Sequence, residues 1–161
     1  MSTRAAAWVA VLLGLSSVGL VVSGALFAGL VGFFSLTLVL DVLWVSVLTA
    51  SFSVVGTIVA SRRPANPLGW IFLAVTLSEG LSGFALPYAE YALLSEPASS
   101  LPGADAMTLL GNVAWFPGFV LVFTYVPLLF PDGRLPSRRW RPVAWISAVQ
   151  LALFALSVGW M

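Results

Sequence analysis

The fold is decided by residues 5–40, an uncharged stretch that reads AAAWVAVLLGLSSVGLVVSGALFAGLVGFFSLTLVL. At about 1.5 Å per residue, a helix of this length is too long for one crossing of a hydrocarbon layer about 30 Å thick. We therefore expect a turn at Gly29 to Ser35, where Gly32, Phe33 and Phe34 suit a membrane interface. The two membrane-spanning helices predicted on either side cover residues 6–28 and 36–60.

The composition of the whole chain points to lipid as its solvent. Of 161 residues, 60% are hydrophobic and 8% are charged, whereas soluble domains carry roughly a quarter charged residues. This number of charged side chains is too small to cover the surface of a water-soluble protein. The excess of apolar residues must therefore face lipid. We therefore predict an all-α, polytopic integral membrane bundle of about five helices, forming one transmembrane domain in the cell membrane.

Two residue types that carry much of enzyme chemistry are missing. The chain contains no cysteine and no histidine. Disulfides, thiolate metal sites and cysteine nucleophiles are thereby excluded, as are the commonest metal ligand and the commonest general base. We expect a protein that is not an enzyme and that binds no metal or cofactor.

The third helix has a clear start signal in the sequence. Arg62, Arg63 and Pro64 end the second helix, because proline disfavours helix in the residue before it. Asn66 then precedes Pro67, and asparagine is a strong N-cap while proline is favoured at the first helical position. The third helix is predicted over residues 67–94.

Two further helices are predicted in the last third of the chain. A small, polar, proline-bearing loop over residues 95–105 precedes a fourth helix at 106–130, in which Pro117 and Pro127 are expected to cause kinks. Pro131, Asp132 and Gly133 then form a turn, in which glycine accepts a left-handed conformation. A fifth helix is predicted over residues 142–161, and its abrupt end suggests a partial chain.

The orientation follows from the basic residues, which collect in short cytoplasmic loops. All of them are arginines that fall on one side of five alternating crossings, whereas the opposite loops carry only Glu96 and Asp105. The amino terminus is therefore predicted to be cytoplasmic. The basic residues form no extended stripe, so we expect the lipid bilayer, and no nucleic acid, as a partner. The topology-setting residues are Arg4, Arg62, Arg63, Arg134, Arg138, Arg139 and Arg141.

A competing interpretation makes residues 1–25 a signal peptide. Arg4 would then be its basic start, and Ser23-Gly24-Ala25 would be a small-residue cleavage site. Cleavage there would remove the first helix. The mass of the purified protein would distinguish the two interpretations.

Glu79 is the side chain that most invites a functional hypothesis. It lies eleven residues beyond Leu68, about 16 Å into the third helix and near the membrane midplane. No basic residue lies in any predicted span, so the carboxyl should be protonated or face a polar interior. A stripe of small and polar residues accompanies it at helical spacing: Thr76, Gly80, Gly83, Pro87 and Glu90.

Two hypotheses for Glu79 stay open on the sequence. The functional one is a proton-responsive or ligand-responsive acid between helices, with Thr76 beside it. The structural one is a neutral acid that hydrogen-bonds to Ser17, Thr49 or Ser53 at similar depth. Asp41, about five residues into the second helix, is expected at the outer interface, and its separation from Glu79 argues against a catalytic acid pair.

Small residues line one face of each of the first two helices. Such faces let helix backbones approach closely, and packing within one chain is the simpler explanation. A homodimer seam is the alternative. The faces comprise Gly14, Ser17, Val21, Gly24 and Ala28 on the first helix, and Ser46, Thr49, Ser53, Gly56 and Ala60 on the second.

Two cytoplasmic loops resemble a known family. The first is Arg62 to Trp70 (RRPANPLGW), including Asn66, Pro67, Gly69 and Trp70; the second is Leu128 to Trp145 (LLFPDGRLPSRRWRPVAW), including Pro131, Asp132 and Gly133. As a pair they are similar to the membrane-embedded amino-terminal region of actinobacterial-type sensor histidine kinases and related uncharacterised membrane proteins. The resemblance spans roughly Val55 to Trp145.

This resemblance implies an input module for a cytoplasmic kinase output. No residue here can carry kinase activity, since the chain has no phosphoacceptor histidine and no nucleotide-binding glycine motif, and no soluble output domain is expected in it. The sequence thus predicts a non-catalytic sensing or anchoring module of a signal-transduction protein, acting with a cytoplasmic signalling partner or as a homodimer. A small transporter or channel subunit is the alternative, and a ligand-free membrane scaffold is another.

Overall fold

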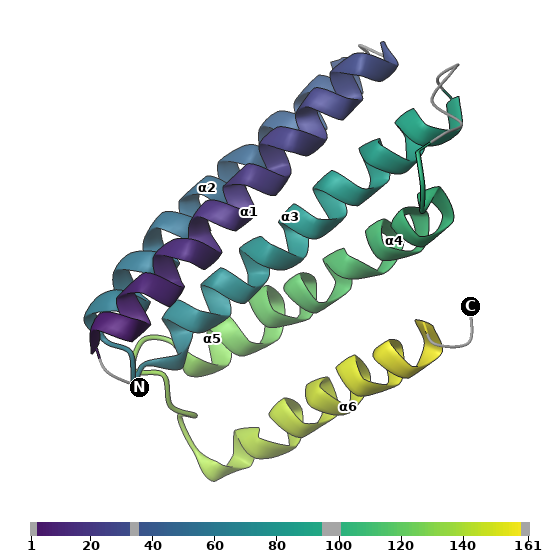
Figure 1. The fold of residues 1–161 in the computed structure, drawn as a ribbon. Coiled ribbons are helices and arrows are strands. Elements are labelled where there is room, and N and C mark those ends of the chain that lie inside the picture. The colour runs from purple at the N-terminus through teal and green to yellow at the C-terminus, as the bar shows by residue number, and fades with distance from the viewer. Residues whose placement is uncertain (1–2, 33–35, 95–100, 159–161) are drawn as a thin grey trace.

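The computed structural model describes residues 3–32, 36–94 and 101–158. Within these ranges the chain forms helices and no β-strand, which confirms the predicted all-α bundle (Figure 1). The elements in chain order are α1 (Thr3–Val31), α2 (Leu36–Arg62), α3 (Pro67–Leu94), α4 (Ala104–Val120), the π-helical segment η2 (Leu121–Tyr125), α5 (Val126–Leu129), the 3-10 turn η3 (Arg138–Trp140) and α6 (Arg141–Val158).

Four helical stretches are long and apolar enough to cross a membrane. They are Thr3–Val31, Val39–Arg62, Pro67–Leu94 and Ala104–Leu129. The helix α6 forms where a fifth crossing is predicted, but its 18 residues span only about 27 Å, slightly less than the hydrocarbon layer. Residues 159–161, which the prediction includes, lie outside the described residues. A crossing by α6 therefore stays a prediction.

The start of α3 confirms the predicted cap. The Oδ1 atom of Asn66 accepts a hydrogen bond of 3.0 Å from the backbone N–H of Leu68, and Pro67 is the first helical residue. Asn66 thus satisfies one of the donors that a helix start leaves unpaired.

The predicted turns are described only in part. After α1, Gly32 has a φ of +79°, a left-handed conformation that glycine adopts without strain. Residues 29–31, where the turn is predicted to begin, instead continue α1 to Val31. Residues 33–35 of the predicted turn lie outside the described residues, as do residues 95–100 of the polar loop, with Glu96. Gly133 has a φ of +70°, which confirms the left-handed glycine of the turn that follows α5.

The two prolines that are expected to cause kinks have different helical surroundings, and the kinks themselves stay a prediction. Pro117 lies inside the continuous helix α4 and does not interrupt it. Near Pro127 the helix widens, and the backbone N–H of Val126 donates to the carbonyl of Leu121, five residues back. Because proline lacks an N–H and its ring clashes with the carbonyl four residues back, a wider preceding turn accommodates it.

The helix α3 is at the centre of the bundle, where it packs against α1, α2 and α4. Its contact with α1 is the closest: a Cβ on Gly24 would collide with the backbone of Gly83 and lie 3.0 Å from the Cα of Phe84. Its contact with α2 is similar, since a Cβ on Gly69 would lie 2.5 Å from the backbone nitrogen of Ala60. Small residues therefore allow both neighbours to approach α3 closely.

The predicted small-residue faces pack inside the chain. On α1 all five members of the face are buried. On α2, Thr49, Ser53, Gly56 and Ala60 are buried and Ser46 is partly buried. The intramolecular explanation is thus confirmed for these faces, and neither face is free to form a dimer seam.

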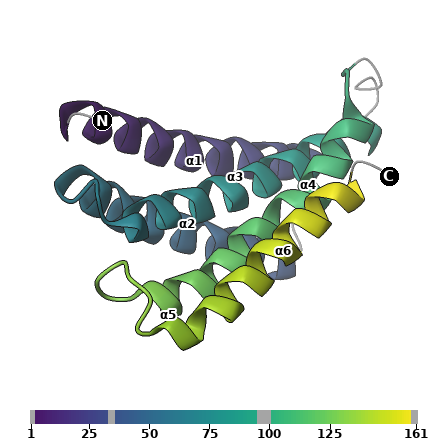
Figure 2. The same ribbon diagram turned by 90° about the horizontal axis from the view of Figure 1, so that it is seen from below.

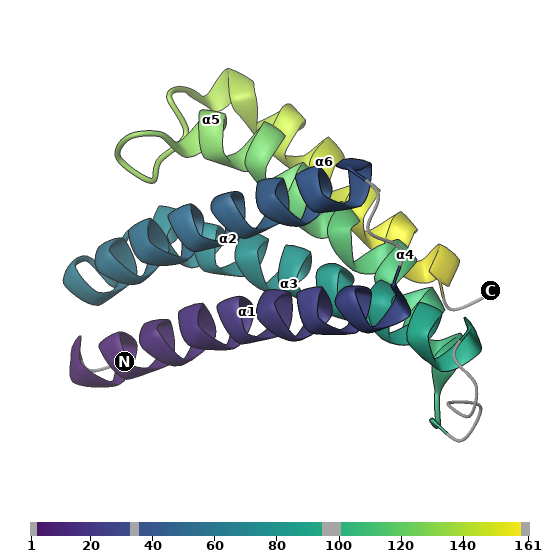
Figure 3. The same cartoon turned by 90° about the horizontal axis from the view of Figure 1, so that it is seen from above.

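The helix α6 is peripheral. Figures 2 and 3 show it beside α4, on the side of the bundle away from α1. The hydroxyl of Tyr125 donates to the carbonyl of Ala144 over 2.8 Å, and the rings of Phe116 and Phe154 lie 4.0 Å apart between centroids. Much of its apolar surface is exposed, as at Trp145, which is 71% exposed.

The arginines gather at one end of the bundle. Figure 1 shows the start of α1, the connection from α2 to α3 and the segment between α5 and α6 at the same end. These segments contain all of the topology-setting arginines predicted above. The shared end agrees with the threading on which the orientation prediction depends.

Candidate functional site

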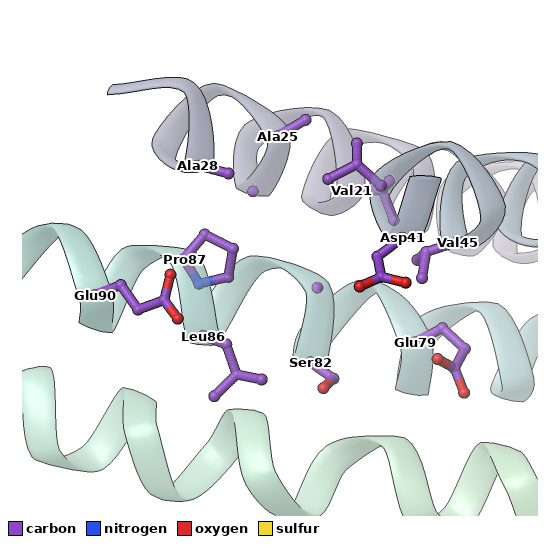
Figure 4. A pocket seen from close by; sticks show the side chains of 13 residues that line it. Val21, Ala25, Ala28, Asp41, Val45, Glu79, Ser82, Leu86, Pro87 and Glu90 are labelled. Carbon is purple, nitrogen blue, oxygen red and sulfur yellow. The ribbon is translucent and has the colours of Figure 1, made fainter. Parts of the chain in front are cut away.

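Glu79 lies near the middle of α3 and faces α4. A Cβ placed on Gly118 of α4 would be 3.1 Å from the Oε1 atom of Glu79, so the absence of a side chain at Gly118 makes room for the carboxyl. Figure 4 shows this carboxyl directed toward the α4 ribbon. No hydrogen bond or ion pair joins it to another of the described residues. The Glu79 carboxyl is therefore available to a ligand or to water.

One cavity beside Glu79 is acidic. It lies between α1, α2 and α3, has a volume of about 280 Å³, and is lined by the three carboxyl side chains of Asp41, Glu79 and Glu90, together with Ser82 and apolar or small residues. In Figure 4, Asp41 projects from α2 and Glu90 lies further along α3. We call this space the acidic cavity. Its residues belong to the half of the bundle away from the arginines.

A second cavity beside Glu79 is aromatic. It lies between α2, α3 and the α4–η2 helix, and its volume is about 530 Å³. We call it the aromatic cavity. Its walls include the side chains of Trp44, Phe52, Trp115, Phe119 and Phe123. Glu79 lines both cavities, so α3 borders both spaces at this residue.

Thr49 is a buried polar residue of the aromatic cavity. Its side chain is only 2% exposed, and its Oγ1 atom is buried without a hydrogen-bond partner among the described residues. Other hydroxyls in these helices donate to the carbonyl four residues back, as Ser51 does to Val47 over 2.7 Å. A buried hydroxyl without a hydrogen-bond partner is unfavourable, unless a ligand or a water molecule forms a hydrogen bond with it.

Thr76 has a structural role in addition to lining the aromatic cavity. Its hydroxyl lies 3.1 Å from the Oγ of Ser17 on α1 and 3.0 Å from the carbonyl oxygen of Leu73. The predicted stripe therefore divides: Thr76 and Gly80 face α1, and Glu79 faces α4.

The interhelical hydrogen bond expected of Glu79 is not formed in the described part of the chain. Ser17 is bonded to the carbonyl of Leu13 and to Thr76, and Ser53 donates to the carbonyl of Gly14 over 3.5 Å. Thr49 has no partner. The reason is geometric, because Ser17 and Ser53 belong to the contacts of α1, whereas the Glu79 carboxyl points to α4.

The two loop motifs come together in space. A Cβ on Gly133 would lie 2.6 Å from the Oδ1 of Asn66 and 2.6 Å from the Cδ of Pro67, so the turn after α5 packs directly on the start of α3. The indole N–H of Trp70 donates to the carbonyl of Pro64 over 3.0 Å. Pro131 and Asp132 are exposed beside this contact.

Sequence reasoning missed most of the aromatic cavity. Trp115 and Phe119 are four residues apart on either side of Gly118, so helical spacing alone places an aromatic pair around a gap. Trp44 and Thr49 have no comparable signal in the sequence. For Thr49 the reason is that the unpaired state of its hydroxyl depends on the packing of the helices around it. Within the described ranges, no group of three metal-ligating side chains is placed to hold a metal ion.

Comparison with protein-family models, with curated proteins and with solved structures finds no match for this chain.

Proposed function

We propose that this chain is a non-catalytic membrane sensing module, the input region of a signal-transduction protein of the sensor histidine kinase type. In this proposal it resides in the plasma membrane and acts with a cytoplasmic signalling partner. The observation that carries the proposal is that one helix, α3, bears Glu79 at its middle and the contact between the two loop motifs at its start.

The connection between these two places is short and rigid. Thirteen residues separate Asn66 from Glu79, about 20 Å of continuous helix. A change at the Glu79 carboxyl that tilts or shifts α3 would therefore displace Asn66 and Pro67, against which Gly133 packs. Helix shifts of about 1–2 Å are a recurring element of allosteric transitions at subunit interfaces.

Spin-label distances test this proposal directly. The chain has no cysteine, so Arg63→Cys and Arg138→Cys, both at exposed positions, create a single labelled pair. Double electron–electron resonance in nanodiscs would compare the parent pair with Glu79→Gln and with the control Glu90→Gln. We expect Glu79→Gln to shift the distance distribution by about 2 Å and the control to leave it unchanged. Equal distributions in all three proteins would contradict the sensing proposal.

One observation favours transport as the second candidate function. Glu79 lines both the acidic cavity and the aromatic cavity, and an acidic residue that borders two spaces within the bundle suits a carrier of protons or cations. Proteoliposomes loaded with a pH-sensitive dye would test this. The sensing proposal expects no flux above that of empty liposomes, and flux that Glu79→Gln abolishes would favour the carrier.

A further inference from the structure

The aromatic cavity combines three features that call for a ligand of one chemical class. Its volume of about 530 Å³ falls within the range of about 300–1,000 Å³ typical of small-molecule sites. Its walls are mainly aromatic and apolar, and it holds a carboxyl and an unpaired hydroxyl. We infer that this cavity binds a lipophilic organic ammonium ion. This inference rests on the proposed sensing function, because it names the ligand that the sensing module would detect.

Charge selects a cation. Glu79 contributes the cavity's one carboxyl, no arginine lines the cavity, and no ion pair reaches Glu79 from the described residues. An uncompensated carboxylate in an apolar site is costly, and a cation in the same site removes that cost. A neutral or anionic ligand would leave the carboxyl without a charge partner.

The aromatic walls favour the same ligand. Trp44 and Trp115 come from opposite sides of the cavity, from α2 and α4, and Phe119 lies one helical turn beyond Trp115. The faces of aromatic rings attract organic cations, tryptophan most strongly, and the attraction grows when the cation is desolvated. An ammonium group carrying apolar substituents therefore gains from the walls and from Glu79 together.

Thr49 specifies an ammonium that retains an N–H. Thr49 lines the cavity, and its Oγ1 atom is buried and has no partner in the described part of the chain. A rotation of the Thr49 side chain would present this oxygen to one N–H of the ligand, while a second N–H donates to Glu79. Quaternary ammonium ions lack such a donor and should bind more weakly than secondary amines of equal size.

Access from the lipid completes the description. The floor of the cavity is α3, and its two sides are α2 and the α4–η2 helix. Trp44 is 65% exposed and Phe123 is 66% exposed at its edge, so the cavity opens on the surface that lipid covers. A ligand that partitions into the bilayer can therefore enter sideways.

The test uses two ligands of equal shape and the full chain in phosphatidylcholine nanodiscs. Radiolabelled benzyl(octyl)ammonium has an NH₂⁺ group where benzyl octyl ether has an oxygen. Equilibrium dialysis against empty nanodiscs measures binding of each ligand. We expect saturable binding of one ammonium per chain, with at least about tenfold weaker binding of the ether.

Matched variants locate the bound ammonium. Glu79→Gln should weaken its binding about tenfold or more, and Thr49→Val about threefold to tenfold. The controls Glu90→Gln, in the acidic cavity, and Thr108→Val, on α4 outside the aromatic cavity, should change it less than about twofold. Circular dichroism would confirm that each variant is folded.

Several outcomes would overturn the inference. Equal binding of ammonium and ether would mean that the cavity accommodates any apolar chain, such as a lipid tail. A loss with Glu90→Gln as large as with Glu79→Gln would place the cation in the acidic cavity, and absence of saturable binding would remove the site. The sensing proposal fails separately, since it depends on the spin-label distances and not on this ligand pair.

Discussion

The substitution Gly24→Ala should loosen the contact between α1 and α3. A Cβ at this position would lie 2.8 Å from the carbonyl carbon of Gly83, and still nearer to its oxygen. Carbon atoms in ordinary contact lie about 3.5 Å apart or more, so the two helices must separate by at least about 0.7 Å. The atoms that the new Cβ would meet belong to the backbone of Gly83 and Phe84, so no rotamer change can relieve the overlap.

The separation has a second cost at the adjacent hydrogen bond. Ser17 and Thr76 join α1 to α3 over 3.1 Å, and a further 0.7 Å or so would exceed the usual hydrogen-bond limit. Overpacking typically costs about 1–3 kcal/mol and an interhelical hydrogen bond in a membrane contributes about 0.6 kcal/mol. We therefore expect Gly24→Ala to lower the free energy of unfolding by roughly 1.5–3.5 kcal/mol.

Gly19→Ala is the matched control, because a Cβ at Gly19 would meet no atom within 4 Å. The alanine should be neutral or stabilise α1 by up to about 1 kcal/mol, the difference in helix propensity. Titration with sodium dodecyl sulfate in mixed micelles, followed by tryptophan fluorescence, measures both variants. The reasoning is refuted if Gly24→Ala unfolds at the same detergent fraction as Gly19→Ala, or at a higher one.

Three further substitutions probe the loops and α6. Gly133→Ala and Gly103→Ala should each lower the free energy of unfolding by about 1–2 kcal/mol, because both glycines have a positive φ, +70° and +80°. Gly133→Ala should cost more, since its Cβ would also crowd Asn66 whereas Gly103 has open space. The same detergent titration measures the difference. Asn66→Ala should destabilise by about 0.5–2 kcal/mol through loss of the cap and Asn66→Asp much less, whereas equal losses would contradict the cap. Tyr125→Phe removes the bond to Ala144 and should speed hydrogen exchange in α6 several-fold; unchanged exchange would show that this bond does not hold α6.

The elements that sequence reasoning predicts best are those marked by local chemistry. Asn66 and Pro67 mark the start of α3 with a cap and a fixed backbone angle, and the structure places both as expected. Gly133 is similarly predictable, because a left-handed turn favours glycine. Hydrophobic length predicts five crossings, and four of them correspond to described helices that are long and apolar enough to cross a membrane, because this signal depends only on composition along the chain.

The candidate site depends on packing between helices and is therefore less visible in the sequence. Depth along α3 singles out Glu79, but the direction of its carboxyl follows from Gly118 on another helix. Helical spacing groups Thr76 with Glu79, but Thr76 contacts Ser17 on α1 whereas Glu79 faces α4. The sequence alone does not show this difference. The unpaired state of Thr49 is invisible until three helices are placed around it.

The backbone contact of Gly24 with Gly83 also limits where the bundle can deform. Because main-chain atoms meet there, α1 and α3 cannot slide or close further and should move as one body. The walls of the aromatic cavity carry large side chains instead, so we expect Trp44, Trp115 and Phe119 to set the width of this cavity. Ligands of different girth should then be accommodated by rotation of these side chains, because Gly111 and Gly118 hold α4 close to α3.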